Sequence, residues 1–199
     1  MLDGEISHDQ VTRLLSSAPK NSADLWRVVK PLLRSVERPD ATLSIDDSIG
    51  AKPSTDENDI ICWHWSHSFK RHIKGLEFLT AFYHVDDVSL PIAFDLVEKT
   101  EEYVDAKTGL PKRRSPLTKN ERYRMLLRVA VHNQIQFQYV LNDVWFASAD
   151  NMKYVKSELK KDFIMPLKTN RKVALSAEDK RRKRYVAVSS LDLHADTTR

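Results

Sequence analysis

The sequence is poor in features that several classes of protein require. It has one cysteine in 199 residues, which excludes a disulfide framework and any zinc site built from four cysteines. No window of eighteen residues is uninterruptedly apolar, so we expect no transmembrane helix. The first residues are acidic and lack the apolar core of a signal peptide. These absences predict a soluble cytoplasmic protein in a reducing compartment.

The composition favours a folded domain with an uneven charge. The apolar fraction is 41%, enough to bury a core and to exclude wholesale disorder. The net charge of +4 combines −5 in residues 1–100 with +9 in residues 101–199. A basic half beside an acidic half hints at a polyanionic partner, although a solvated surface with uneven charge is the simpler interpretation.

The order of apolar patterns predicts an α/β fold. Residues 1–40 read as an N-terminal helical appendage; a DNA-reading helix-turn-helix is less favoured, because they hold six basic residues and no basic recognition face. An antiparallel run of three strands and then parallel strands joined by helices would form a mixed sheet with flanking helices. The long apolar strand 73–85 fits a strand covered on both faces. Residues 99–116 read as an exposed, mobile loop. The strands expected are 41–46, 60–64, 73–85, 90–97, 137–142, 162–167 and 185–191, and helices are expected near 118–130, 148–159 and 176–184.

Two aspartates each come just past the end of a predicted strand. Strands 41–46 and 137–142 are natural parallel neighbours, and functional groups in open α/β sheets gather at the carboxyl ends of strands. Asp47 and Asp143 could therefore bind hard divalent cations through oxygen ligands. Two such ions ~3.5–4 Å apart activate an attacking oxygen and stabilise a leaving oxygen. An Asp in this position also often caps a turn, so position alone does not decide its role.

Five segments together resemble the insertion-sequence DDE transposases. The first acidic motif of that family is similar to Ile-Asp-Asp-Ser-Ile-Gly-Ala-Lys-Pro at 45–53, and the second to Tyr-Val-Leu-Asn-Asp-Val-Trp-Phe-Ala-Ser at 139–148. Segments 57–67, 74–80 and 163–168 are also similar to this family. The resemblance extends over nearly the whole chain.

This resemblance implies an RNase H-like fold, with residues 41–199 as the catalytic domain and Asp47 and Asp143 as metal ligands. It implies cutting and joining of DNA strands with Mg²⁺, for which Mn²⁺ could substitute. The implied partner is double-stranded DNA, at transposon ends and target, in a nucleoid-associated cytoplasmic location. It also allows a homodimer of the full-length parent.

The sequence departs from the family at the third acidic residue. The family needs a Glu on a helix well downstream of the second Asp, and no such helix is evident before residue 199. We therefore expect an N-terminal fragment, truncated before that residue and inactive in strand transfer. The alternative is a non-catalytic DNA-binding or regulatory protein on an RNase H-like scaffold.

Other residues offer competing assignments. Glu178 and Asp179 follow Asp143 by 35 and 36 positions and could complete a compact nuclease site, but acids after Ser176 are ordinary capping chemistry. Asp46 is a less favoured metal ligand than Asp47. The spacing of Cys62, His64, His67 and His72 fits no standard zinc site.

Three basic groups are candidates for contacts with DNA phosphates, which carry no sequence information. The aromatic pair Trp145 and Phe146 reads as core anchors rather than base-stacking groups. The basic candidates are Lys112, Arg113 and Arg114, then Arg124 and Arg128 on one helix face, and then Lys180, Arg181, Arg182, Lys183 and Arg184.

Overall fold

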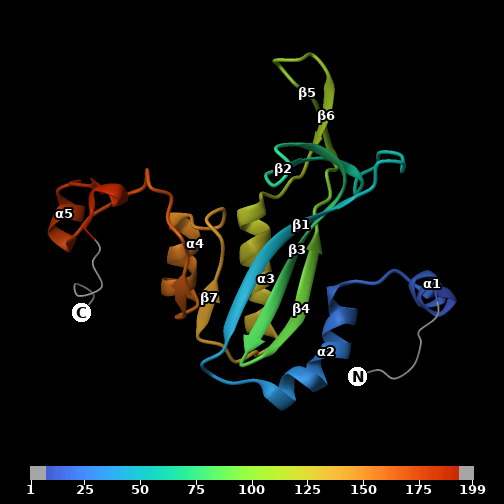
Figure 1. Ribbon diagram of the computed structural model, residues 1–199, viewed down its shortest axis with the longest axis horizontal. Coiled ribbons are helices and arrows are strands. Elements are labelled where there is room, and N and C mark those ends of the chain that lie inside the picture. The colour runs from blue at the N-terminus through green and yellow to red at the C-terminus, as the bar shows by residue number, and fades with distance from the viewer. Residues whose placement is uncertain (1–7, 193–199) are drawn as a thin grey trace.

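A long antiparallel ladder between two strands, β1 and β3, forms the spine of the computed structural model, which describes residues 8–192 (Figure 1). Helices and short strands are added to this ladder in chain order. The elements are α1 (His8–Ser17), α2 (Ser22–Val36), β1 (Thr42–Ala51), β2 (Cys62–Ser66), β3 (Arg71–Val85), β4 (Val88–Leu96), β5 (Glu101–Val104), β6 (Pro111–Arg114), α3 (Lys119–His132), β7 (Tyr139–Leu141), α4 (Ala149–Lys153), the π-helical turn η1 (Tyr154–Glu158), β8 (Asp162–Ile164), β9 (Lys172–Val173), α5 (Ala177–Arg181), β10 (Val186–Ala187) and the 3-10 turn η2 (Val188–Ser190).

The central sheet is mixed, as the sequence predicts. Its strand order is β2-β3-β1-β7-β8, with β4 also paired to β3. The β1, β2 and β4 pairings with β3 are antiparallel, whereas β7 is parallel to β1 and β8 is parallel to β7. This mixed α/β sheet with flanking helices is compatible with an RNase H-like fold.

One face of the sheet is buried against helices. Alternate residues of β3, from Glu77 to Val85, are buried on this face, and α3 contributes Tyr123 and Leu127 to the same core. Helix α2 adds Val29 and Leu33 to that core, so it packs with the sheet rather than apart from it. Figure 1 shows α2 changing direction along its length, which a proline inside the helix at position 31 explains.

The opposite face of the sheet is only partly covered. The expectation that strand 73–85 is covered on both faces is wrong, because the residues of β3 that point to this face, such as Phe78 and Phe82, are only half-buried. Leu141 of β7 and Ile164 of β8 are 42% and 60% exposed. The apolar run in the sequence of β3 therefore predicts more burial than this strand has in the structure.

Two further expectations are corrected by the structure. Residues 99–116 are not a plain loop, because β5 and β6 pair as an antiparallel hairpin that projects from the main sheet (Figure 1). The predicted strand 185–191 shrinks to β10 followed by η2. No helix within residues 8–192 is both long and apolar enough to cross a membrane.

Candidate active site

Asp46 and Asp47 both lie inside β1, whereas the sequence predicts that Asp47 comes just past the end of this strand. The predicted strand 41–46 extends to Ala51, because β3 offers a pairing partner along the whole of this segment. Asp46 pairs in register with Thr80, and Asp47 pairs with Leu79. Since successive side chains of a strand point to opposite faces, Asp47 points to the face covered by α3 and Asp46 to the open face.

The third candidate, Asp143, is held at the end of β7 by its neighbour. Asn142 is buried, donates from Nδ2 to the Ile45 carbonyl at 2.8 Å and accepts from the Tyr123 hydroxyl at 2.8 Å. Asp143 Oδ1 then accepts the Trp145 amide at 2.9 Å, which fixes the turn after the strand. Because Ser44 pairs with Leu141, continuing this parallel register places Asp143 beside Asp46.

Asp46, Asp47 and Asp143 are all among the residues that line one cavity of about 450 Å³. Its rim is aromatic. His67 stacks on Trp145 with ring centroids 4.0 Å apart, and the Lys168 ammonium lies 4.4 Å from the Trp145 ring centroid. The prediction of Trp145 as a core anchor is therefore wrong, since its side chain is 48% exposed at this rim, whereas Phe146 is 1% exposed, as predicted.

A buried polar chain leads from β2 to Asp47. His64 Nδ1 lies 2.9 Å from Glu77 Oε2 and donates to it, since an ionised carboxylate can only accept. The other oxygen of Glu77 lies 2.5 Å from Lys119 Nζ, and the same ammonium lies 2.7 Å from Asp47 Oδ2. The side chains of His64 and Glu77 are only 1% and 5% exposed, whereas those of Asp47 and Lys119 are 22% and 40% exposed.

The pKa values of the carboxylates shift in opposite directions because their surroundings differ. Burial raises the pKa of Asp46, and the negative charges of Asp47 and Asp143 raise it further, against a backbone hydrogen bond that lowers it. Burial alone would raise the pKa of Glu77, but hydrogen bonds from His64 and Lys119 outweigh it and lower the pKa to about 2. For Lys119, burial is outweighed by its two carboxylate partners, so its pKa is raised. The site therefore carries ionised Glu77 and Lys119 at neutral pH.

The donor set suits a hard divalent cation only in part. Carboxylate oxygens are the ligands that Mg²⁺ prefers, and Asp47 and Asp143 both line the cavity. Within residues 8–192, however, no three or more His, Cys, Asp or Glu side chains gather closely enough to hold a metal ion together. Two carboxylates would leave most of the coordination to water, which Mg²⁺ tolerates.

Glu178 and Asp179 are used within their own turn. Glu178 pairs with Arg181 at 2.7 Å and with Arg182 at 2.5 Å. Asp179 accepts from the Ser176 hydroxyl at 2.6 Å, and its amide donates back to that hydroxyl, which is a helix cap. Figure 1 shows α5 beyond α4, away from β1.

The Cys/His group is dispersed among separate contacts. His64 belongs to the Glu77 chain, and His67 lies at the rim with Trp145. Cys62 donates from Sγ to the Asn58 carbonyl, while the His72 ring meets Trp65 edge-on at 5.2 Å.

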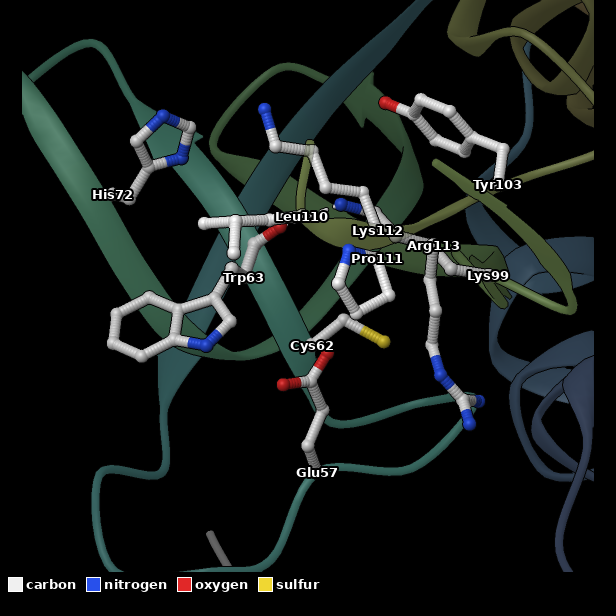
Figure 2. A pocket seen from close by; sticks show the side chains of 10 residues that line it. All are labelled: Glu57, Cys62, Trp63, His72, Lys99, Tyr103, Leu110, Pro111, Lys112 and Arg113. Carbon is white, nitrogen blue, oxygen red and sulfur yellow. Dashed lines mark hydrogen bonds between the residues drawn. The ribbon is translucent and has the colours of Figure 1, made fainter. Parts of the chain in front are cut away.

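A second cavity, of about 560 Å³, lies between β2 and the β5–β6 hairpin and shares no lining residue with the first (Figure 2). Lys99 lies in its wall and donates to the Trp63 carbonyl at 2.6 Å. Burial lowers the pKa of Lys99. Figure 2 shows one acidic side chain there, Glu57, so this cavity lacks the paired carboxylates of the first.

Two of the three predicted phosphate-binding groups already have partners within the chain. Arg124 donates to Asn151 and Arg128 to the Tyr154 hydroxyl, so this pair holds α3 against α4 and η1. Residues 112–114 are ion-paired on the hairpin: Lys112 with Asp105, Arg113 with Asp59 and Glu102, and Arg114 with Glu101.

The basic run at 180–184 is more available. All five side chains are exposed. Arg181 and Arg182 pair with Glu178, whereas Lys180, Lys183 and Arg184 have no side-chain partner in the described part of the chain.

Sequence reasoning overlooks Lys119 and Glu77, and it considers His64 only as part of a Cys/His group whose spacing fits no zinc site. One signal for Glu77 was available, because this acid alternates with the apolar residues Leu79 and Ala81 on one face of the strand. Lys119 gives no such signal, since a lysine beside a helix cap is ordinary, and its contact with Asp47 spans 72 positions of sequence.

Comparison with known proteins shows the family of the chain. The sequence profile of the family described as "DDE superfamily endonuclease" matches residues 2–186. No match was found among curated proteins. Among solved structures, the "Drosophila P element transposase strand transfer complex" is similar at a TM-score of 0.27 and 12% identity, over 78% of this chain and 40% of that chain. So low a TM-score carries no argument, and the match to the endonuclease family stands on its own.

Proposed function

Because the chain belongs to the DDE superfamily of endonucleases, we propose that it forms the catalytic core of a transposase, with Asp47 and Asp143 as ligands of a divalent metal ion. The observation that carries the proposal is the shared cavity. Asp47 of β1 and Asp143, which follows the neighbouring parallel strand β7, both line one cavity of about 450 Å³.

Members of this superfamily generally act with divalent metals, and we propose Mg²⁺, with Mn²⁺ as a substitute. When bound, the ion would activate an attacking oxygen and stabilise the leaving oxygen of a phosphodiester. The protein's own residues hold the two carboxylates before an ion binds. Lys119 donates to Asp47 Oδ2, and the Trp145 amide donates to Asp143 Oδ1.

We propose double-stranded DNA as the partner, at transposon ends and target, in a nucleoid-associated setting, with a homodimer as the assembled form. The exposed run 180–184 supports phosphate contacts, because three of its five cations have no side-chain partner among the described residues. The exposed His67–Trp145 stack at the rim of the cavity offers an aromatic surface beside the carboxylates.

One observation favours the second candidate, a non-catalytic DNA-binding protein. The described residues supply no group of three metal ligands, and Asp46 and Asp47 point to opposite faces of β1. We therefore expect the 199-residue chain to bind metal weakly and not to cut DNA by itself.

The experiment is a nicking and strand-transfer assay on supercoiled plasmid with Mg²⁺ or Mn²⁺, run beside Mn²⁺ binding. Wild type should bind Mn²⁺, and Asp47→Ala and Asp143→Ala should each lose that binding. Absence of Mn²⁺ binding in wild type would favour the non-catalytic candidate. Metal-dependent nicking abolished by both substitutions would support the endonuclease role and show that a third ligand is present in the chain.

A further inference from the structure

The position of Lys119 is not explained by its own helix. Lys119 is the first residue of α3, directly after the N-cap Thr118. The amino end of a helix carries a partial positive charge and favours acids, as Glu121 shows by completing the capping box. A lysine there is locally unfavourable unless something else holds it.

The two carboxylates that hold Lys119 differ in their surroundings. Glu77 is 5% exposed and receives both His64 Nδ1 and Lys119 Nζ, so it is a fully engaged buried anion. Asp47 is 22% exposed and is one of the residues that line the cavity. One ammonium therefore bridges a permanent buried acid and an acid that faces the candidate metal site.

From this geometry we propose that Lys119 is a resident counter-cation of Asp47, which a divalent metal ion must displace. Glu77 is the positioning residue that keeps the ammonium when the metal takes Asp47. The inference rests on the proposed function, because it treats Asp47 as a metal ligand. His64 supports the same arrangement by holding the second oxygen of Glu77.

The consequence is that Lys119 and Glu77 act on metal affinity with opposite signs. Removing the Lys119 charge ends its repulsion of a divalent ion and frees Asp47 Oδ2, so metal binding should tighten by about tenfold. Removing the Glu77 charge leaves Asp47 as the only anion for the ammonium, so metal binding should weaken by a few-fold. A purely structural role would weaken metal binding in both cases, because damage to the site cannot improve it.

The test measures Mn²⁺ dissociation constants by electron paramagnetic resonance on the whole 199-residue chain. Lys119→Met removes the charge, and Lys119→Gln removes it while keeping a donor for Glu77, so one variant remains if the other fails to fold. Lys119→Arg keeps the charge and should resemble wild type. Glu77→Gln tests the opposite sign. Lys156→Met is the matched control, because Lys156 pairs with Asp162 at the surface, away from the cavity.

Tighter binding in Lys119→Met or Lys119→Gln, with weaker binding in Glu77→Gln and no change in Lys156→Met, supports the proposal. Unchanged or weaker binding in both neutral Lys119 variants overturns it. Asp143→Asn distinguishes failure of the metal site from failure of the Lys119 role. If this variant loses Mn²⁺ binding while the Lys119 variants gain none, the metal site stands and only the counter-cation role fails. If wild type and the Lys119 variants all bind no Mn²⁺, the metal site and the inference fail together.

Discussion

Asp46 and Asp47 are neighbours in sequence, yet the strand sends them to opposite faces. Asp47 meets a cation, Lys119, at 2.7 Å. Asp46 meets no cation in an ion pair among the described residues, and its pKa is raised by burial and by the charges of Asp47 and Asp143. The alternation of a β-strand therefore produces two carboxylates of different character from an Asp-Asp pair.

Glu77 gives a prediction on stability and pH. Its folded pKa of about 2 lies below the value of 4.5 for an unperturbed Glu, so its ionised form stabilises the fold above about pH 4.5. That stabilisation is lost as the pH falls toward 2. Urea unfolding should show wild type more stable than Glu77→Gln by about 3 kcal/mol at pH 7, with the difference shrinking toward pH 2. A difference that stays constant from pH 7 to pH 2.5 would contradict the ionised, paired state of Glu77.

Asn142 gives a second prediction. Asn142→Ala leaves the Ile45 carbonyl and the Tyr123 hydroxyl without their buried partner, which costs about 1–3 kcal/mol. It should also weaken Mn²⁺ binding, since Asp143 is the next residue along the chain. Tyr123→Phe is the control, because it removes the hydroxyl and leaves the bond from Asn142 to β1 intact. Equal losses of Mn²⁺ affinity in both variants would show that Asn142 does not position Asp143.

Some residues of the candidate site can be identified from the sequence and others cannot. Asp47 and Asp143 can be singled out from the sequence because each stands near the end of a recognisable strand pattern, and their role as metal ligands stays a prediction. The chain from His64 through Glu77 to Lys119 is not predictable, because it depends on the pairing of β2 with β3 and on where α3 starts above β1.

At the scale of elements, the register of β1 with β3 decides where the site lies. The two strands pair without a break from Thr42–His84 to Ala51–Gly75. At its last pair, Gly75 also faces Cys62 of β2, so three strands meet there. The extension of β1 beyond the predicted 41–46 follows from this pairing, which no local pattern in residues 47–51 reveals.

Gly75 gives the prediction at this scale. A Cβ at Gly75 would lie 2.3 Å from the Gly50 carbonyl oxygen, so Gly75→Ala must push β1 and β3 apart. We expect a loss of about 1–3 kcal/mol in the free energy of unfolding. Gly50→Ala is the matched control, since its Cβ would meet only the Leu76 side chain, at 3.5 Å. Thermal unfolding measures both, and similar small effects would contradict the close approach of the strands.

The β5–β6 hairpin shows the limit of sequence patterns for elements. Residues 99–116 are charged and hold one glycine and two prolines, which is typical of a loop. The hairpin is held by cross-strand pairs of opposite charge, such as Arg114 with Glu101, opposite each other in the ladder. Charge pairing between strands leaves no apolar alternation for sequence analysis to detect.

At the scale of the whole molecule, part of the basic charge predicted to contact DNA is already engaged within the chain. The hairpin cations 112–114 are ion-paired, and Arg124 and Arg128 pack α3 against α4 and η1. The run 180–184 lies on α5 and the turn after it. Within the described residues, three of its cations have no side-chain partner. The basic residues of the C-terminal half therefore differ in how free they are to contact DNA, which their number alone does not show.

The difference between the unpaired cations of the run 180–184 and the ion-paired cations 112–114 predicts how DNA binding depends on salt. Neutralising Lys180, Lys183 and Arg184 to Gln should reduce the slope of log affinity against log salt, by about 0.9 for each phosphate that the protein no longer neutralises. Neutralising Lys112, Arg113 and Arg114 should change the slope less, because these cations are already paired with carboxylates. Fluorescence anisotropy with one duplex at several salt concentrations measures both. An unchanged slope in the first variant would remove the run 180–184 from the interface.

The most direct test of the central claim is anomalous diffraction from crystals of the chain soaked in Mn²⁺. We expect one anomalous peak in the cavity of the three carboxylates, bonded to an oxygen of Asp47 and an oxygen of Asp143, with Lys119 moved toward Glu77. A strong peak elsewhere, for example on Glu178, or an empty cavity at saturating Mn²⁺, would contradict Asp47 and Asp143 as the metal ligands.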